Sequence, residues 1–167
     1  MNGFQLCRNV KNDFKLSHIP IVLLTAESSD TGRENGYKSG ADSYITKPFN
    51  MNVLRARINQ LIEQREQRKK RFNSDVLIDP KDITISPLDE KFMSKAMECI
   101  KKNMNNADYG VEAFSSDMAM ERSNLYRKMQ AVVGKTPSEF IRSIRLKRAA
   151  QLLKTKNYSV LDVSVMV

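Results

Sequence analysis

One short segment of this chain is dense in side chains that can hydrogen-bond to the edges of nucleic-acid bases. An arginine can give a guanine two parallel hydrogen bonds, and an asparagine can bond an adenine in the same bidentate way. Ser123 and Arg127 are four residues apart, so a helix would bring both to one face. The candidate contact residues are Arg122, Ser123, Asn124, Tyr126, Arg127 and Lys128. They predict binding to double-stranded DNA, and a solvated helix face is the alternative.

Two residues in or beside this segment have more than one possible role. Tyr126 suits half-buried packing and a contact with the nucleic-acid backbone equally well. Glu121 comes just before the segment, where a carboxylate favours the positive end of a helix dipole but repels phosphate.

Two short predicted helices would position these side chains. The first ends near Asp117, a tight turn spans residues 118–121, and the second covers residues 122–133 and stops at Gly134. The apolar stripe expected on the buried side of the second helix is Leu125, Met129, Val132 and Val133. Two short helices joined by a three- to four-residue turn have the spacing of a helix-turn-helix. The second helix of that motif enters the major groove of DNA.

Longer helices are predicted on both sides of this motif. Ser86 and Pro87 begin a helix that runs to about Asn103, with a capping pattern completed by Asp89. A second capping box, T-P-S-E, begins a basic helix over residues 137–155. The basic side chains of this region, which fit a solubilising face or phosphate contacts, are Arg142, Arg145, Lys147, Arg148, Lys154 and Lys156.

Three segments carry a family resemblance in the right order: LYRKM, GKTPSEFIRSIRLKRAAQLL and YSVLDVSVMV. Together they resemble the DNA-binding domain of AraC-type transcription regulators, which implies an all-α domain over residues 87–167. In that family two helix-turn-helix units flank a long helix. We therefore expect the first helix-turn-helix to be complete and the second helix-turn-helix to be cut short at Val167.

The front of the chain has a different pattern. Residues 1–62 predict a helix–strand–helix–strand–helix series, and therefore a parallel sheet with crossover helices. The run Ile19–Thr25 is apolar throughout, which is typical of a strand buried on both faces, and residues 42–46 form the second strand. The three predicted helices cover residues 2–12, 29–39 and 50–71.

The motifs MNGF, SHIPIVLLTA, GADSYI and TKPF resemble the C-terminal half of a two-component receiver domain. The resemblance implies a partial flavodoxin-like α/β fold with a cis Lys47–Pro48 bond. It also implies three switch residues: Thr25 to bond a phosphoryl oxygen, Lys47 to pair with that anion, and Tyr44 to move inward. The family's phosphoacceptor aspartate and acidic metal pocket lie upstream of the matched segment. We therefore expect no acceptor and no Mg²⁺ site here, and an open sheet edge that favours association.

These resemblances predict three parts: half a receiver domain at 1–63, a basic and polar linker at 64–86, and the DNA-binding domain at 87–167. The net charge of +9 follows the same division. Residues 1–50 have a net charge of +1, residues 51–87 of +3, and residues 88–167, with 14 basic and 9 acidic side chains, of +5. The excess predicts a polyanionic partner, but composition alone does not separate DNA from RNA or anionic lipid.

Composition also argues against several classes of protein. The two cysteines, Cys7 and Cys99, lie in apolar helical patterns, which suits a reducing cytoplasm rather than a disulfide framework. With His18 as the sole histidine and no CxxC motif, a zinc site is not expected. There is no signal peptide and no apolar run as long as a membrane span. A glycine-rich nucleotide loop and a phosphoacceptor histidine context are also missing, so we expect no enzyme, no cofactor and no small-molecule substrate.

The sequence therefore predicts a cytoplasmic, sequence-specific DNA-binding regulator of a two-component phosphorelay, and a piece of a longer hybrid sensor-regulator. The expected partners are double-stranded DNA, a second copy bound through the receiver part, and an upstream histidine kinase module. The rival hypothesis is a dimerisation or signalling module, derived from a receiver, with little specific DNA binding.

Overall fold

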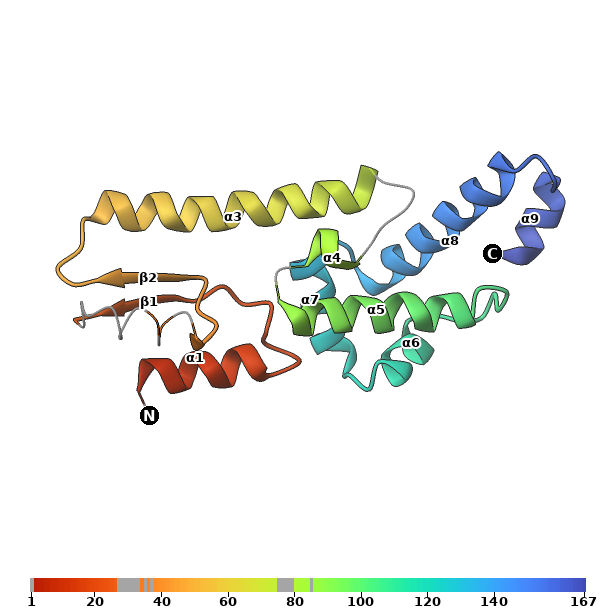
Figure 1. Cartoon of the computed structure of the whole chain (residues 1–167). Coiled ribbons are helices and arrows are strands. Elements are labelled where there is room, and N and C mark those ends of the chain that lie inside the picture. The colour runs from red at the N-terminus through yellow and green to blue at the C-terminus, as the bar shows by residue number, and fades with distance from the viewer. Residues whose placement is uncertain (1, 27–33, 35, 37, 75–79, 85) are drawn as a thin grey trace. The chain divides into compact units, whose positions relative to one another are not determined.

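The computed structural model describes residues 2–26, 34, 36, 38–74, 80–84 and 86–167. The chain divides into two compact units, Met1–Gln67 and Arg68–Val167 (Figure 1). Among the described helices, none is long and apolar enough to cross a membrane.

The first unit is a small parallel α/β arrangement. Helix α1 covers Gly3–Asn12, strand β1 Val22–Thr25, strand β2 Ser43–Thr46, and helix α3 begins at Met51. The two strands pair in parallel, from Val22 opposite Ser43 to Thr25 opposite Thr46, which confirms the predicted parallel sheet. The helix predicted over residues 29–39 falls mostly outside the described residues.

Local contacts explain how α1 is held against the sheet. Asn2 and Gln5 form a capping box that begins the helix. At the other end, the Nζ atom of Lys11 lies 2.6 Å from Oδ2 of Asp42 and donates to the Ile19 carbonyl over 2.8 Å. The same Asp42 oxygen accepts from the Ile21 amide over 2.7 Å. This pair therefore joins the end of α1 to the starts of both strands.

The first unit is more exposed than its apolar sequence predicts. Leu24 is 40% exposed and the other three residues of the strand are half-buried, so β1 is not buried on both faces as predicted. Leu6 of α1 is 50% exposed. A strand becomes buried on both faces only where other elements cover both, and in the described part of this unit one face of β1 stays open.

The second unit is helical. It contains the end of α3 (Met51–Ser74), then α4 (Pro80–Ile83), α5 (Pro87–Lys102), α6 (Val111–Asp117), α7 (Arg122–Val133), α8 (Pro137–Lys154) and α9 (Val160–Met166). The predicted caps are present: Ser86 accepts from the Asp89 amide, and Thr136 and Glu139 form a capping box. Ser159 and Asp162 form another one, which begins α9.

The segment predicted as a linker, residues 64–86, is not a simple spacer. Residues 64–74 continue α3, and residues 80–83 form α4. Phe72 is fully buried, and its ring stacks on Phe140 of α8 with centroids 5.4 Å apart. Phe140 in turn stacks on Phe114 of α6 over 6.3 Å. The end of α3 is therefore part of the core of the second unit, because it contributes a large aromatic side chain to that core.

Candidate nucleic-acid interface

Helices α6 and α7 form the predicted helix-turn-helix. The turn between them covers residues 118–121, as predicted, and Ala119 adopts a left-handed conformation with φ of 53°. The Met120 amide donates to the Ser115 carbonyl over 3.1 Å, so the turn folds back on α6. Met118 and Met120 are buried. These contacts fix the angle at which the chain enters α7.

The buried side of α7 is the predicted stripe. Leu125, Met129 and Val133 are fully buried, and Val132 is nearly so. Gly134 ends the helix with φ of 70°, a left-handed conformation that glycine adopts without steric cost. The opposite side of α7 is therefore the side that faces solvent.

The solvent side of α7 carries most of the candidate contact residues. Arg122, Ser123 and Arg127 are exposed, Tyr126 is 49% exposed, and Asn124 is half-buried. The Nη2 atom of Arg127 donates to Oδ1 of Asn124 over 2.6 Å. Two of the groups predicted to read bases are thus already hydrogen-bonded to each other. A nucleic acid would have to exchange this bond for bonds to base edges.

Two acidic residues border this face. Asn124 Nδ2 donates to Oε2 of Glu121 over 3.4 Å, and Glu121 is the residue before α7. Arg122 Nη1 lies 3.2 Å from Oε1 of Glu112 on α6, with both side chains well exposed. An exposed pair of this kind contributes little to stability, so Arg122 can leave it at small cost.

Lys128 is a correction to the prediction. Its side chain is fully buried, its Nζ atom lies 3.1 Å from Oδ1 of Asp89 on α5, and it sits 4.8 Å from the centre of the Phe92 ring. The prediction that Lys128 contacts DNA is therefore wrong for this structure. The signal was present in the spacing: Lys128 is three residues after Leu125 and four before Val132, on the buried stripe.

Two basic residues of α8 also bind the protein itself. Arg145 donates to the carbonyls of Asn103 and Asn106, and Lys147 donates to the Phe72 carbonyl over 2.7 Å. Lys147 also lies 5.0 Å from the centre of the Phe72 ring. These two cations brace α8 against neighbouring segments. The remaining exposed cations of the predicted set are Arg142, Arg148, Lys154 and Lys156.

A tyrosine that precedes α6 is hydrogen-bonded to the last residue of that helix. Tyr109 is 5% exposed, and its hydroxyl donates to Oδ2 of Asp117, at the end of α6, over 2.7 Å. Burial, followed by the hydrogen bond and the charge of Asp117, raises the pKa of Tyr109 well above its ordinary value. The tyrosine therefore stays neutral and keeps its donor at any ordinary pH.

The three residues predicted as a receiver switch lie near one edge of the small sheet. Thr25 ends β1, and the Lys47 amide, just after β2, donates to the Thr25 carbonyl over 2.6 Å. The Lys47–Pro48 bond is cis, as predicted. Tyr44 packs against Gly36, where an added Cβ would lie 2.5 Å from the Tyr44 ring. The Lys47 side chain is exposed, and Thr25 and Tyr44 are half-buried.

The aspartates described in the first unit are engaged in local structure. Asp13 accepts from the Lys15 and Leu16 amides over 2.6 and 3.2 Å, and Asp42 pairs with Lys11. Across the described residues of the whole chain, no group of three or more His, Cys, Asp or Glu side chains is arranged to hold a metal ion. Asp30 lies outside the described residues.

Comparison with known proteins finds a family match for the first part of the chain. Residues 1–59 match the family model of the response regulator receiver domain, and the paired parallel strands fit its flavodoxin-like α/β fold. The match does not extend into the second unit. No solved structure matches the chain.

Longer proteins contain similar segments. Over all 167 residues the chain is 44% identical to the histidine kinase P4 of Formosa agariphila, of which it spans 12%. It is 37% identical over 75 residues to the heme response regulator HssR of Staphylococcus epidermidis, covering 45% of this chain and 30% of that protein. For HssR of Staphylococcus haemolyticus the identity is 33% over 105 residues, 63% of this chain and 41% of that protein. These likenesses connect the chain to two-component signalling.

Proposed function

We propose that this chain acts in a two-component phosphorelay as a sequence-specific DNA-binding transcription regulator. The second unit binds double-stranded DNA through α7, and the first unit carries the receiver signal. The observation that carries the proposal is the two-sidedness of α7. One side is sealed by Leu125, Met129 and Val133, while Ser123 and Arg127 stand on the other.

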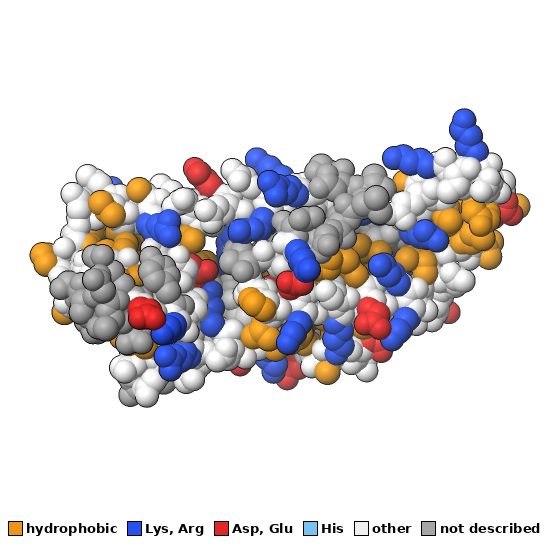
Figure 2. All heavy atoms as spheres, viewed as in Figure 1, with side chains coloured by type: hydrophobic (Ala, Val, Ile, Leu, Met, Phe, Trp, Pro, Cys, Tyr) orange, Lys and Arg blue, Asp and Glu red, His pale blue; other side chains and the backbone are white. Residues whose placement is uncertain are grey.

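The arrangement around α7 supports an AraC-type assignment of the second unit. A complete helix-turn-helix, α6 and α7, precedes the long helix α8, and a further capped helix, α9, follows it. This is the order that the motifs of the sequence imply for that family. Figure 2 shows Lys and Arg side chains spread over the visible face of the chain, a distribution that attracts a polyanion.

The proposed signalling partner is a histidine kinase module, and the role of the chain is binding rather than catalysis. The likeness to a protein named histidine kinase P4 covers every residue of the chain, so both units have counterparts within that longer protein. The match of residues 1–59 to the receiver domain supports Thr25, Tyr44 and Lys47 as the residues that transmit the signal.

The test is binding of the chain to DNA of different sequence. A preferred duplex is first selected from a random pool, and fluorescence anisotropy then compares it with a scrambled duplex over a range of salt concentrations. We expect tighter binding to the selected duplex and a steep loss of affinity as salt rises. Lys95→Ala, which removes an exposed charge from α5, should weaken binding to both duplexes equally. Equal binding of the wild type to both duplexes would contradict sequence-specific recognition.

A dimerisation or signalling module is the second candidate, and an exposed apolar side of α3 favours it. Met51 is 56%, Ile58 41% and Ile62 52% exposed, and their spacing of seven and four residues puts them on one side of the helix. Paired Ile58→Ser and Ile62→Ser substitutions should reduce self-association in sedimentation velocity if this side is an interface. If the pair abolishes association while specific DNA binding is undetectable in the wild type, this second candidate replaces the first.

A further inference from the structure

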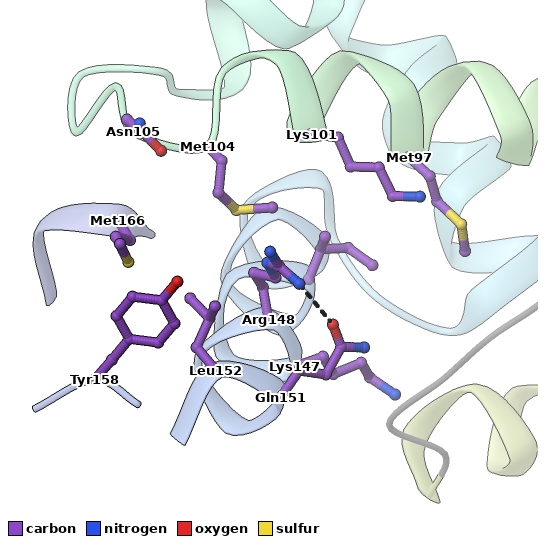
Figure 3. A pocket seen from close by; sticks show the side chains of 11 residues that line it. Met97, Lys101, Met104, Asn105, Lys147, Arg148, Gln151, Leu152, Tyr158 and Met166 are labelled. Atoms are coloured by element: carbon purple, nitrogen blue, oxygen red, sulfur yellow. Dashed lines mark hydrogen bonds between the residues drawn. The ribbon is translucent and has the colours of Figure 1, made fainter. Parts of the chain in front are cut away.

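A cavity of about 640 Å³ lies in the second unit, between the end of α5, the middle of α8 and helix α9 (Figure 3). Its volume is within the roughly 300–1,000 Å³ that is typical of small-molecule sites. It is separate from α7, because none of its described lining residues belongs to that helix. The proposed DNA-binding function makes no use of it.

The cavity has an apolar body. The side chains that provide it are Met97, Met104, Ile144, Leu152 and Met166. Three of these five are methionines, whose flexible and polarizable side chains adapt to ligands of different shape. Figure 2 shows further hydrophobic side chains over α9, and Val160, Leu161 and Val165 of that helix are all more than 70% exposed. These three residues do not line the cavity, and the apolar surface offered to a ligand is that of the five lining side chains.

The charged groups that line the cavity are all positive. Three cations, Lys101, Lys147 and Arg148, contribute to its wall, and none of its eleven described lining residues is acidic. Arg148 lies near the centre of the labelled side chains in Figure 3, where its Nη1 atom donates to Gln151 over 3.4 Å. That long bond leaves most of the guanidinium donors available. The ammonium group of Lys147 donates to the Phe72 carbonyl, so this side chain contributes to the wall of the cavity while bonded to the protein.

We propose that this cavity binds a small amphipathic carboxylate. The guanidinium of Arg148 receives the carboxylate as a bidentate hydrogen-bonded pair, with Lys101 of α5 as a second cation. The apolar part of the ligand lies among the methionines and against Tyr158. A bound molecule would contact α5, α8 and α9 together, and would therefore hold α9 in place.

Isothermal titration of the 167-residue chain with 2-naphthoate tests the proposal, with its neutral isostere 2-naphthamide and inorganic phosphate as the matched probes. We expect 2-naphthoate to bind more tightly than either. Arg148→Gln and Lys101→Gln should each weaken its binding by about tenfold, the size of a hydrogen bond to a charged group. Lys154→Gln, on α8 but outside the cavity lining, should leave the affinity unchanged.

Hydrogen exchange gives a second readout. Bound 2-naphthoate should slow amide exchange in residues 160–166, which form α9. The proposal is overturned if 2-naphthamide binds as tightly as 2-naphthoate, since the cations would then play no part. It is also overturned if phosphate competes as well as 2-naphthoate, or if Arg148→Gln binds like the wild type. Arg148 is exposed, so its variant should fold, and thermal melting checks this.

Discussion

Asp89 and Lys128 form a buried ion pair that joins α5 to the outward-facing helix α7. Their Oδ1 and Nζ atoms are 3.1 Å apart, and the side chains are 4% and 0% exposed. Lys128 is buried whereas the preceding residue, Arg127, is exposed, and the Lys128 Nζ atom lies 4.8 Å from the centre of the Phe92 ring. A buried pair contributes little net stability, but a single orientation of α7 satisfies it. It therefore fixes which side of α7 faces solvent.

The first prediction concerns the stability of this pair. Lys128→Met or Asp89→Leu alone should lower the free energy of unfolding by about 3–5 kcal/mol, because each removes the opposite charge from a buried ion pair. The double variant should regain most of that loss, since neither charge of the pair is then buried. Urea unfolding of the wild type, both single variants and the double variant measures this. A double variant as unstable as the sum of the singles would show that the coupling is absent.

The second prediction concerns base reading. Arg127→Ala should weaken binding to the preferred duplex by about 1–3 kcal/mol and relax the choice of base at one position. Arg127→Lys keeps the charge but not the planar fork, so it should also lose selectivity. Anisotropy titrations against the preferred and scrambled duplexes separate the two effects. An equal loss on both duplexes would mean that Arg127 contacts only phosphate.

The third prediction concerns alkaline pH. Burial raises the folded-state pKa of Tyr109 above its ordinary value of 10.0. Its contribution to stability is therefore complete below pH 10.0 and is lost as the pH rises beyond that value, because the unfolded tyrosine ionises first. Tyr109→Phe should flatten this alkaline decline and cost about 1 kcal/mol at neutral pH. Tyr158→Phe, at an exposed site, is the control and should retain the decline in urea unfolding.

The fourth prediction concerns acid pH. The Thr136 amide and hydroxyl hold the pKa of Glu139 below its ordinary value of 4.5. This cap stabilises α8 fully above pH 4.5, and the stabilisation is lost as the pH falls through the lower folded-state pKa. Glu139→Gln should make the stability of α8 less dependent on pH in this range, as followed by circular dichroism. If wild type and variant lose helix in parallel on acidification, the cap is not the cause.

Much of the local structure could be predicted from the sequence. The capping box of Thr136 and Glu139, the turn at residues 118–121 and the parallel pairing of β1 with β2 all agree with the predictions. The capping box and the turn depend on interactions between residues close in sequence, and the parallel pairing follows from the alternating order of helices and strands. Such signals are present in the chain before it folds.

Only the tertiary structure decided which side chains are exposed to solvent and which are buried. The spacing puts Lys128 on the apolar stripe of α7, but only the packing of α5 against α7 supplies Asp89 as the partner with which this charge is buried. Phe72 similarly follows a run of charged residues, yet it lies in the core because α8 supplies Phe140 to stack on it. Burial depends on partners that are distant along the chain, so these roles arise only when the helices pack together.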